Sequence, residues 1–174
     1  YDSVKYYKSF LQVGFMAVEP YTGYVRAWVG GPNFEYFKYD HCNVNTKRQV
    51  GSTFKPVQYA LAVDNGWSPC MPIPTGPITI TYQGQVWQPK NSGRFGGSYP
   101  MKVCLAHSIN TAAAYMMKNF GPEALVDLSH KMGITSKIPT VPSICLGAGE
   151  ISLYEMMTVY STFCNAGIST KPQY

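Results

Sequence analysis

The segment Gly51-Ser52-Thr53-Phe54-Lys55-Pro56 constrains this chain most strongly, because it opens a predicted helix with a serine and a lysine three positions apart. Residues at that spacing are neighbours on a helix, so the Lys55 amine can approach the Ser52 hydroxyl. A serine hydroxyl becomes a good nucleophile when a neighbouring base accepts its proton. Lysine serves as that base only where burial or nearby positive charge lowers its pKa. The segment therefore predicts a serine nucleophile with a lysine base.

The apolar pattern after Ser52 predicts a helix that runs to about Asp64 and ends near Asn65-Gly66. Its core-facing residues are predicted to be Phe54, Val57, Leu61 and Ala62. Pro56 conflicts with a start at Ser52, because proline lacks a backbone donor and disfavours helical geometry at the preceding residue. A second interpretation stays open, in which Ser52 only caps the helix and Lys55 is a solvated side chain.

Ser108-Ile109-Asn110 lies downstream between two apolar segments, and it offers a hydroxyl and an amide that could face Ser52. Serine and asparagine also favour helix boundaries, because their side chains bond to nearby backbone groups. The alternative interpretation is therefore a pair of polar residues that closes one helix and opens another.

Five segments taken together resemble a known family. They are residues 18–31 (VEPYTGYVRAWVGG), 48–56 (RQVGSTFKP), 87–91 (WQPKN), 108–110 (SIN) and 146–152 (LGAGEIS). In this order and spacing they resemble the transpeptidase domain of penicillin-binding proteins, most closely that of the bifunctional, glycan-polymerising class. The agreement runs from about residue 10 to the end of the chain.

The resemblance implies an α+β fold of the penicillin-binding and serine β-lactamase type, in which strands of an antiparallel sheet pack with helices. It implies acyl transfer from the penultimate D-alanine of a peptidoglycan stem peptide, through an acyl-enzyme on Ser52, to an amine on a neighbouring strand. Lys55 would be the general base, Ser108 would relay protons to the leaving amine, and Asn110 would bind the substrate amide and position Lys55. β-Lactam antibiotics would acylate the same serine. Neither a cofactor nor a metal is implied.

One motif of the family, Lys-Thr/Ser-Gly on an edge strand, does not occur in the sequence. We therefore expect a fragment that is incomplete at its C-terminus and inactive by itself, with residues 1–10 as a linker from a missing upstream domain and 11–174 as the N-terminal and central part of a transpeptidase domain. The resemblance also implies an upstream membrane anchor and glycosyltransferase domain. The parent protein would then act outside the cytoplasm, on the periplasmic face of the inner membrane.

Local patterns predict the remaining elements. Apolar runs at 11–19 and 24–29 predict an antiparallel hairpin, and 78–82 with 85–87 predict a short hairpin around Gly84. Residues 32–50 show no clear period and are predicted to form a loop. Periodicity alone would fuse the helical residues on both sides of Ser108, but the resemblance requires a break there. Further helices are predicted between Pro122 and Gly133, and from a capping box of Ser152 and Glu155 to Gly167. The apolar face of the last helix is predicted to be Leu153, Met156, Met157, Tyr160 and Phe163.

Composition excludes some functions. The net charge is +5, but the basic residues are scattered and Lys47-Arg48 is the only adjacent pair, which argues against nucleic-acid binding. No apolar run reaches the roughly 20 residues that span a bilayer. The five cysteines are dispersed and odd in number, so we expect buried free thiols and no zinc ribbon. A metal site would require two distant pairs to converge, Cys104 with His107 and His41 with Cys42.

Three functions remain open at this point. The first is a peptidoglycan transpeptidase whose partners are stem peptides, glycan strands, β-lactams and other cell-wall synthesis proteins. The second is a D,D-carboxypeptidase or β-lactamase of the same fold, which would pass the acyl group to water. The third is a non-catalytic module that binds glycan strands or a protein partner. The hairpin at 18–31 and the segment around Trp87 favour the first.

Overall fold

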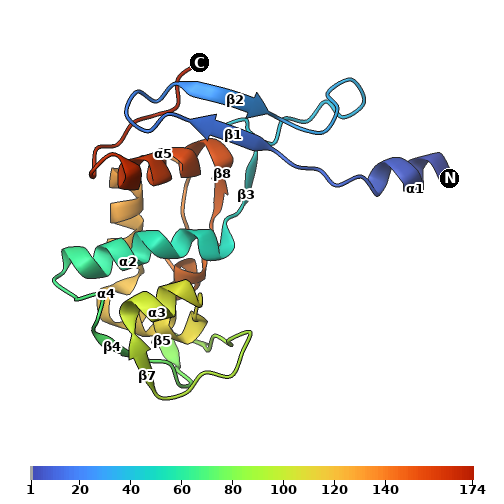
Figure 1. The fold of residues 1–174 in the computed structure, drawn as a ribbon. Coiled ribbons are helices and arrows are strands. Elements are labelled where there is room, and N and C mark those ends of the chain that lie inside the picture. The colour runs from blue at the N-terminus through green and yellow to red at the C-terminus, as the bar shows by residue number, and fades with distance from the viewer. Residues whose placement is uncertain (1) are drawn as a thin grey trace. The chain divides into compact units, whose positions relative to one another are not determined.

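The computed structural model describes residues 2–174, which divide into two compact units (Figure 1). The terminal unit joins the residues up to Lys47 to Ser152–Tyr174, and the central unit is Arg48–Ile151. Both units mix helices with short strands, and the three strand pairs with a determined register are antiparallel, as the predicted α+β class requires.

The terminal unit contains the predicted hairpin. Strand β1 (Phe15–Val18) pairs antiparallel with β2 (Val25–Val29), and the register shifts between Ala17 and Val18. The strands are shorter than predicted, but the turn at residues 20–23 is confirmed. Helix α1 (Asp2–Lys8) precedes them, within the segment predicted as a linker. The domain role of that segment stays a prediction.

Helix α5 (Leu153–Cys164) packs against β1 in the same unit. The predicted capping box is confirmed. The Ser152 hydroxyl accepts a hydrogen bond from the Glu155 amide at 3.2 Å, and the Glu155 carboxylate accepts one from the Ser152 amide at 3.1 Å. These bonds satisfy two backbone donors that lack partners at the start of a helix.

The predicted apolar face of α5 is wrong in part, because Tyr160 and Phe163 are exposed. Their rings instead contact each other at the surface, with centroids 6.2 Å apart. Thr158 and Thr162 are buried in their place. Each of these hydroxyls donates to the carbonyl four residues earlier, so the polar group is satisfied inside the helix and its burial costs little.

Strand β3 (Lys47–Gln49) pairs with β8 (Glu150–Ser152). The prediction of an uninterrupted loop over residues 32–50 is therefore wrong at its end. All three residues of β3 are polar and exposed, so no local apolar pattern marks the strand. It forms because β8 offers a pairing partner.

The helix predicted from Ser52 begins differently. A 3₁₀ turn, η1 (Gly51–Phe54), comes first, and the α-helix α2 runs from Lys55 to Asp64. Pro56 then lies in the first turn of α2, where a backbone donor is not needed. The four predicted core residues, Phe54, Val57, Leu61 and Ala62, are all buried.

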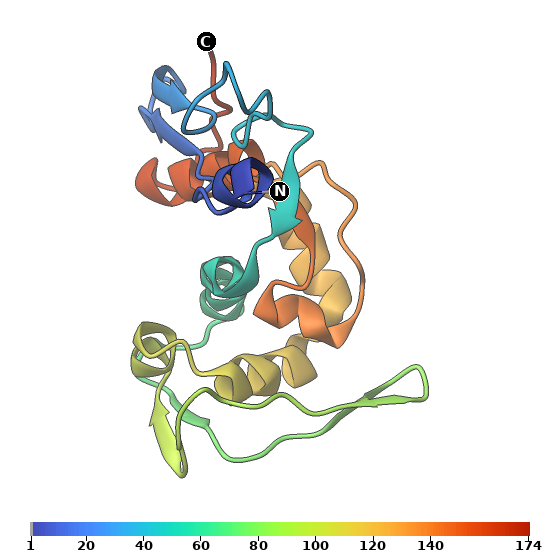
Figure 2. The same ribbon diagram turned by 90° about the vertical axis from the view of Figure 1, so that its right-hand side faces the viewer.

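Two short strand pairs follow in the central unit. The predicted hairpin forms between β5 (Ile80–Tyr82) and β6 (Gln85–Trp87), and its turn projects beyond the helices of this unit in Figure 2. The Tyr82 hydroxyl of β5 donates a hydrogen bond to the Glu123 carboxylate at 2.6 Å. The pair β4 (Pro72–Pro74) and β7 (Ser98–Pro100) was not predicted. Prolines at both ends of β4 remove ladder donors and hide the strand from a pattern search.

The helical half of the central unit has the predicted break. Helix α3 (Met101–Ala106) ends before Ser108, and α4 (Asn110–Lys131) begins after it. Gly121 has non-helical angles (φ 78°, ψ 161°), so α4 restarts at Pro122 as predicted. A short 3₁₀ helix, η2 (Pro142–Leu146), precedes β8. The core of this half is formed by Tyr59, Ala62, Ile73, Met101, Cys104, Ile109, Ala112 and Met116.

None of the helices within residues 2–174 combines the length and hydropathy that a bilayer span requires. All five cysteines are free thiols, as predicted. The prediction that they are buried is confirmed for Cys42, Cys104 and Cys145 and wrong for Cys70 and Cys164, which are exposed.

Candidate active site

Lys55 forms the centre of a hydrogen-bonded cluster in the central unit. Its side chain is 1% exposed. The amine donates to the Ser108 carbonyl oxygen at 2.6 Å, to Ser108 Oγ at 2.9 Å and to Asn110 Oδ1 at 2.7 Å. These three contacts match the three N–H donors of a protonated amine, whereas a neutral amine has two donors and a lone pair that can accept from the Ser108 hydroxyl. The structure thus brings together three of the four predicted site residues.

Ser52, the fourth predicted residue, lies in η1 with its side chain exposed. Its carbonyl oxygen accepts a hydrogen bond from the Lys55 amide. Within residues 2–174 its hydroxyl makes no hydrogen bond to the Lys55 amine, which contacts Ser108 and Asn110 instead. Catalytic hydrogen bonds often tighten only when substrate is bound. Ser52 thus lies three residues before Lys55 with its side chain exposed to solvent.

Burial shifts the pKa of the Lys55 amine. It lowers the pKa of the Lys55 amine below its ordinary value of 10.5, and the neighbouring Cys145 thiol acts weakly in the opposite direction. Cys145 is itself buried, which raises its pKa to about 12. At neutral pH this thiol stays protonated and supplies no negative charge to hold the ammonium form. The net effect shifts the Lys55 amine toward its neutral form, which is the direction that a general base requires.

Ser108 reaches Lys55 through an unusual backbone conformation. Its φ is +51°, in the left-handed region that non-glycine residues seldom adopt. The turn is held by hydrogen bonds from the Ser108 amide to the Leu105 carbonyl (2.9 Å) and from the Ile109 amide to the Cys104 carbonyl (3.0 Å). Because Ile109 is 1% exposed, the chain is anchored directly after the serine. This geometry turns both oxygens of Ser108 toward one amine.

A loop after η2 supports the backbone just before Ser52. The Gly51 amide donates to the Gly147 carbonyl oxygen at 3.1 Å, and the Val50 amide donates to the Gly149 carbonyl oxygen at 3.3 Å. Both Gly51 and Gly147 have positive φ, +56° and +72°. The glycines of the segment 146–152 thus hold the turn that carries the serine.

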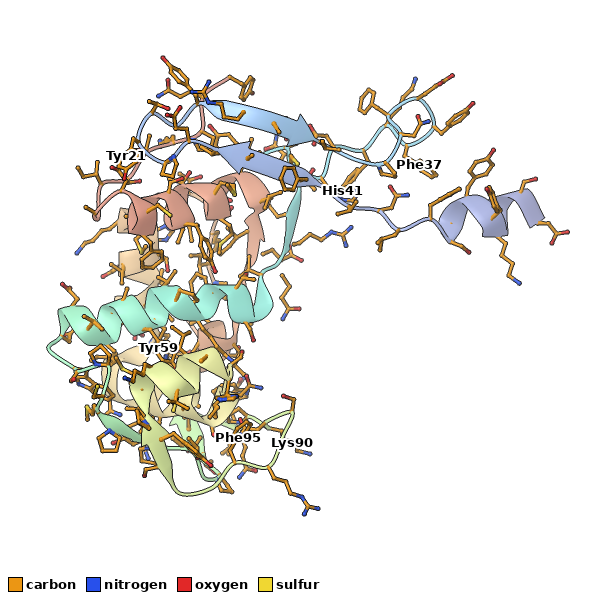
Figure 3. All side chains as sticks on the ribbon, viewed as in Figure 1. Tyr21, Phe37, His41, Tyr59, Lys90 and Phe95 are labelled. Carbon is orange, nitrogen blue, oxygen red and sulfur yellow. The ribbon has the colours of Figure 1, made fainter. Side chains whose placement is uncertain are left out.

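Sequence reasoning found Lys55 as a partner of Asn110 but missed a second partner. The Asn110 Nδ2 group donates to the backbone carbonyl of Lys90 at 2.8 Å. Lys90 lies on the loop between β6 and β7 (Figure 3). Residues 88–91 of the loop belong to the segment 87–91, which carried part of the resemblance without a predicted role for Lys90 or Asn91. A backbone carbonyl has no sequence signature, so only the resemblance could have drawn attention to the loop.

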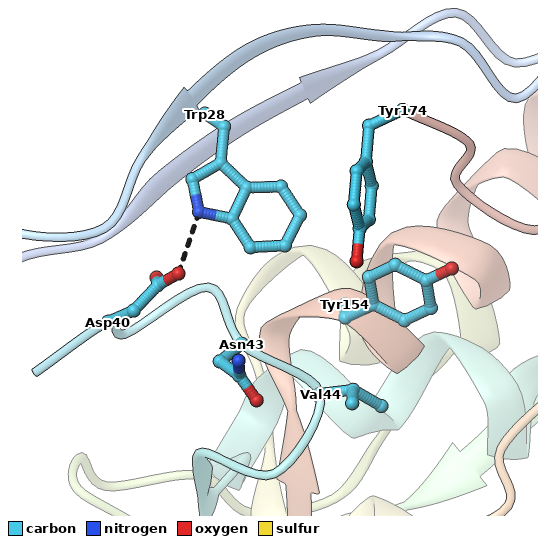
Figure 4. A pocket seen from close by; sticks show the side chains of 6 residues that line it. All are labelled: Trp28, Asp40, Asn43, Val44, Tyr154 and Tyr174. Carbon is cyan, nitrogen blue, oxygen red and sulfur yellow. Dashed lines mark hydrogen bonds between the residues drawn. The ribbon is translucent and has the colours of Figure 1, made fainter.

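A separate pocket of about 560 Å³ lies within the terminal unit (Figure 4). It is lined by Trp28, Asp40, Asn43, Val44, Tyr154 and Tyr174. Asp40 accepts hydrogen bonds from the Trp28 indole and the Cys42 amide. Tyr154 donates its hydroxyl to the Pro172 carbonyl. Most polar atoms of this pocket are thus engaged within the protein, and none of the four predicted site residues lines it.

Known proteins resemble this chain over almost all of its length. Residues 13–174 match the profile of the penicillin binding protein transpeptidase domain. Penicillin-binding protein 1A of Pseudomonas aeruginosa is 31% identical over 165 residues, which are 92% of this chain and 20% of that protein. Penicillin-binding protein 2D of Bacillus subtilis is 31% identical over 168 residues, 94% of this chain and 24% of that protein. The chain thus spans about a fifth to a quarter of the length of these relatives.

Comparison with solved structures supports the same family. The crystal structure of penicillin-binding protein 1A from Haemophilus influenzae matches with a TM-score of 0.88 and 28% identity, covering 93% of this chain and 25% of that one. The chain therefore belongs to the penicillin-binding protein transpeptidase domain family.

Proposed function

We propose that this chain is part of a peptidoglycan D,D-transpeptidase in which Ser52 forms an acyl-enzyme and Lys55 is the general base. One observation carries the proposal. Lys55 is almost fully buried, its pKa is lowered, and its amine bonds to both Ser108 and Asn110. A buried base beside an exposed serine is what nucleophilic catalysis needs. Family membership supports the substrate class, a D-alanyl-D-alanine stem peptide.

In the acylation step the Ser52 oxygen attacks the carbonyl of the penultimate D-alanine, and its proton passes to the neutral Lys55 amine. The peptide bond to the terminal D-alanine then breaks. Ser108 Oγ lies 2.9 Å from the Lys55 amine, so it is placed to pass the proton to the leaving amino group. Asn110 Oδ1 keeps the Lys55 amine directed toward Ser108 while this transfer occurs.

The second step regenerates the serine. An amine on a neighbouring glycan strand attacks the ester carbonyl, its proton returns through Lys55, and the Ser52 oxygen leaves. The product is an amide crosslink between two stem peptides. The proposed location is outside the cytoplasm, where peptidoglycan is assembled. β-Lactams are proposed to acylate Ser52 in place of the stem peptide.

Labelling with a fluorescent penicillin tests this proposal. The full encoded protein, its Ser52→Ala variant and a Ser169→Ala variant are compared by gel fluorescence. Ser169 is an exposed serine in the terminal unit and controls for the general loss of a hydroxyl. We expect stable labelling of the unchanged protein and of Ser169→Ala, and none of Ser52→Ala.

The outcomes separate the competing functions. Equal labelling of Ser52→Ala would contradict the nucleophile. No labelling of any protein would favour a non-catalytic module. Labelling that decays quickly while the free drug is hydrolysed would indicate that water is the acceptor, as in a β-lactamase, whereas a transpeptidase keeps the acyl group.

A further inference from the structure

Asn91 makes two hydrogen bonds to one residue of α4. Its Oδ1 accepts from the Thr111 amide at 3.0 Å, and its Nδ2 donates to Thr111 Oγ1 at 2.9 Å. Thr111 is 4% exposed, and its hydroxyl donates in turn to the Thr75 carbonyl at 2.8 Å. Asn91 thus binds Thr111 through both ends of its carboxamide, and this fixes the chain at Asn91 to the start of α4.

The bond to the Thr111 amide also has a local cause. Ile109, at the N-cap of α4, provides no side-chain cap, and the first amides of a helix lack partners within it. Asn91 satisfies one of these amides from a distant part of the chain. It therefore acts as a long-range cap for the helix that begins with Asn110.

This attachment fixes the preceding carbonyl group as well. The Lys90 carbonyl accepts from Asn110 Nδ2 at 2.8 Å, and Lys90 is the residue directly before Asn91. A carboxamide has one donor end and one acceptor end. With its donor end held by Lys90, Asn110 presents its oxygen to the Lys55 amine, 2.7 Å away. If the carbonyl moved, the carboxamide could rotate and direct N–H groups at the amine.

We propose that Asn91 is a positioning residue of the candidate site: through Thr111 it fixes the Lys90 carbonyl, which holds the oxygen of Asn110 toward Lys55. Nothing in the sequence pattern assigns Asn91 this role. Asn91 does not touch the Lys55 amine, and its effect reaches that amine only through Asn110. The kinetic part of the inference rests on the proposed function, whereas the structural part does not.

The experiment uses Asn91→Ala in the full encoded protein. Asn119→Ala is the matched control, because Asn119 is an exposed asparagine of α4 whose side chain donates to the Tyr115 carbonyl within its own helix. A second pair changes the partner. Thr111→Val removes the hydroxyl that accepts from Asn91, and Thr111→Ser keeps it.

The first measurement is the hydrogen-exchange rate of the Asn110 side-chain amide by NMR. We expect this rate to be at least about tenfold faster in Asn91→Ala, because the Asn110 side-chain amide then loses its fixed acceptor and opens to water. Thr111→Val should shift the rate in the same direction by less, since one of the two bonds remains. Asn119→Ala and Thr111→Ser should match the unchanged protein.

The second measurement is the rate of acylation by a fluorescent penicillin, in a double-mutant cycle with Asn110→Ala. Asn91→Ala should slow acylation about 10- to 100-fold in the unchanged background, the range expected for a misplaced catalytic group. In the Asn110→Ala background it should add nothing, because both changes act through one group. A merely structural role would slow both backgrounds by the same factor.

Both measurements can contradict the proposed role of Asn91. Unchanged exchange of the Asn110 amide in Asn91→Ala, or equal slowing in both backgrounds, overturns the inference. If Asn91→Ala does not fold, unchanged exchange in folded Thr111→Val overturns it. If the unchanged protein takes no label, the proposed function fails, and the exchange measurement still decides whether Asn91 positions Asn110.

Discussion

A Cβ atom built on Gly147 would lie 2.0 Å from the carbonyl oxygen of Gly51, closer than any real side chain approaches backbone. The two glycines are also joined by a hydrogen bond of 3.1 Å. Gly51 directly precedes Ser52, so this contact fixes the turn that carries the proposed nucleophile. The loop after η2 therefore belongs to the site although none of its side chains takes part in the chemistry.

Gly147→Ala should destabilise the protein and slow acylation of Ser52. Two terms add: a non-glycine residue at φ +72° costs about 1 to 2 kcal/mol, and the clash with Gly51 forces the backbone apart. Thermal unfolding and fluorescent-penicillin labelling measure the two effects.

Gly84→Ala separates the two terms. Gly84 has φ +78°, close to that of Gly147, but a Cβ there would meet nothing within 4 Å. It should lose only the conformational term and keep the unchanged labelling rate. Equal losses of stability in the two variants would mean that the contact with Gly51 carries no energy.

The strained conformation of Ser108 predicts an inversion between two substitutions. Ser108→Ala and Ser108→Gly both remove the hydroxyl that accepts from Lys55, so both should slow labelling. Alanine keeps the strain of φ +51°, whereas glycine relieves about 1 kcal/mol of it. Ser108→Gly should therefore unfold at the higher temperature. The reverse order would show that the left-handed turn is not strained.

Lys55 predicts a dependence of stability on pH. Its pKa is lowered in the folded protein, so between that value and 10.5 the unfolded chain binds more protons than the folded one. The free energy of unfolding, relative to Lys55→Met, should then rise with pH by up to about 1.4 kcal/mol per unit across this window and be constant below it. Chemical denaturation of both proteins from about pH 6 to about pH 10 measures the difference. A flat or falling difference contradicts a lowered pKa.

Several elements could be predicted because their signals are local. The turn at residues 20–23, the hairpin around Gly84 and the capping box of Ser152 with Glu155 each depend on neighbours in the sequence. Strand β3 could not be predicted in this way, since its three polar residues form a strand only when β8 is present. The 3₁₀ turn before Lys55 follows from Pro56, which the sequence marked as a conflict without showing its resolution.

The site also contains residues that the sequence could predict and one group that it could not. Lys55, Ser108 and Asn110 were found because side-chain chemistry and the resemblance both pointed to them, and the structure places them in contact. The Lys90 carbonyl was not found from the sequence, because it is a backbone group whose position depends on bonds made by the next residue. Roles that depend on backbone geometry become visible only in three dimensions.

The pH dependence of the acylation rate tests the central claim most directly, namely that the neutral amine of Lys55 activates Ser52. The rate constant for labelling by a fluorescent penicillin is measured for the unchanged protein and for Lys55→Arg, which keeps the charge but cannot lose its proton. The account predicts that the unchanged protein accelerates with pH through one ionisation whose midpoint lies below 10.5. Lys55→Arg should be about 10²- to 10⁴-fold slower and lack that ionisation. Equal rates and the same pH profile for both proteins would contradict it.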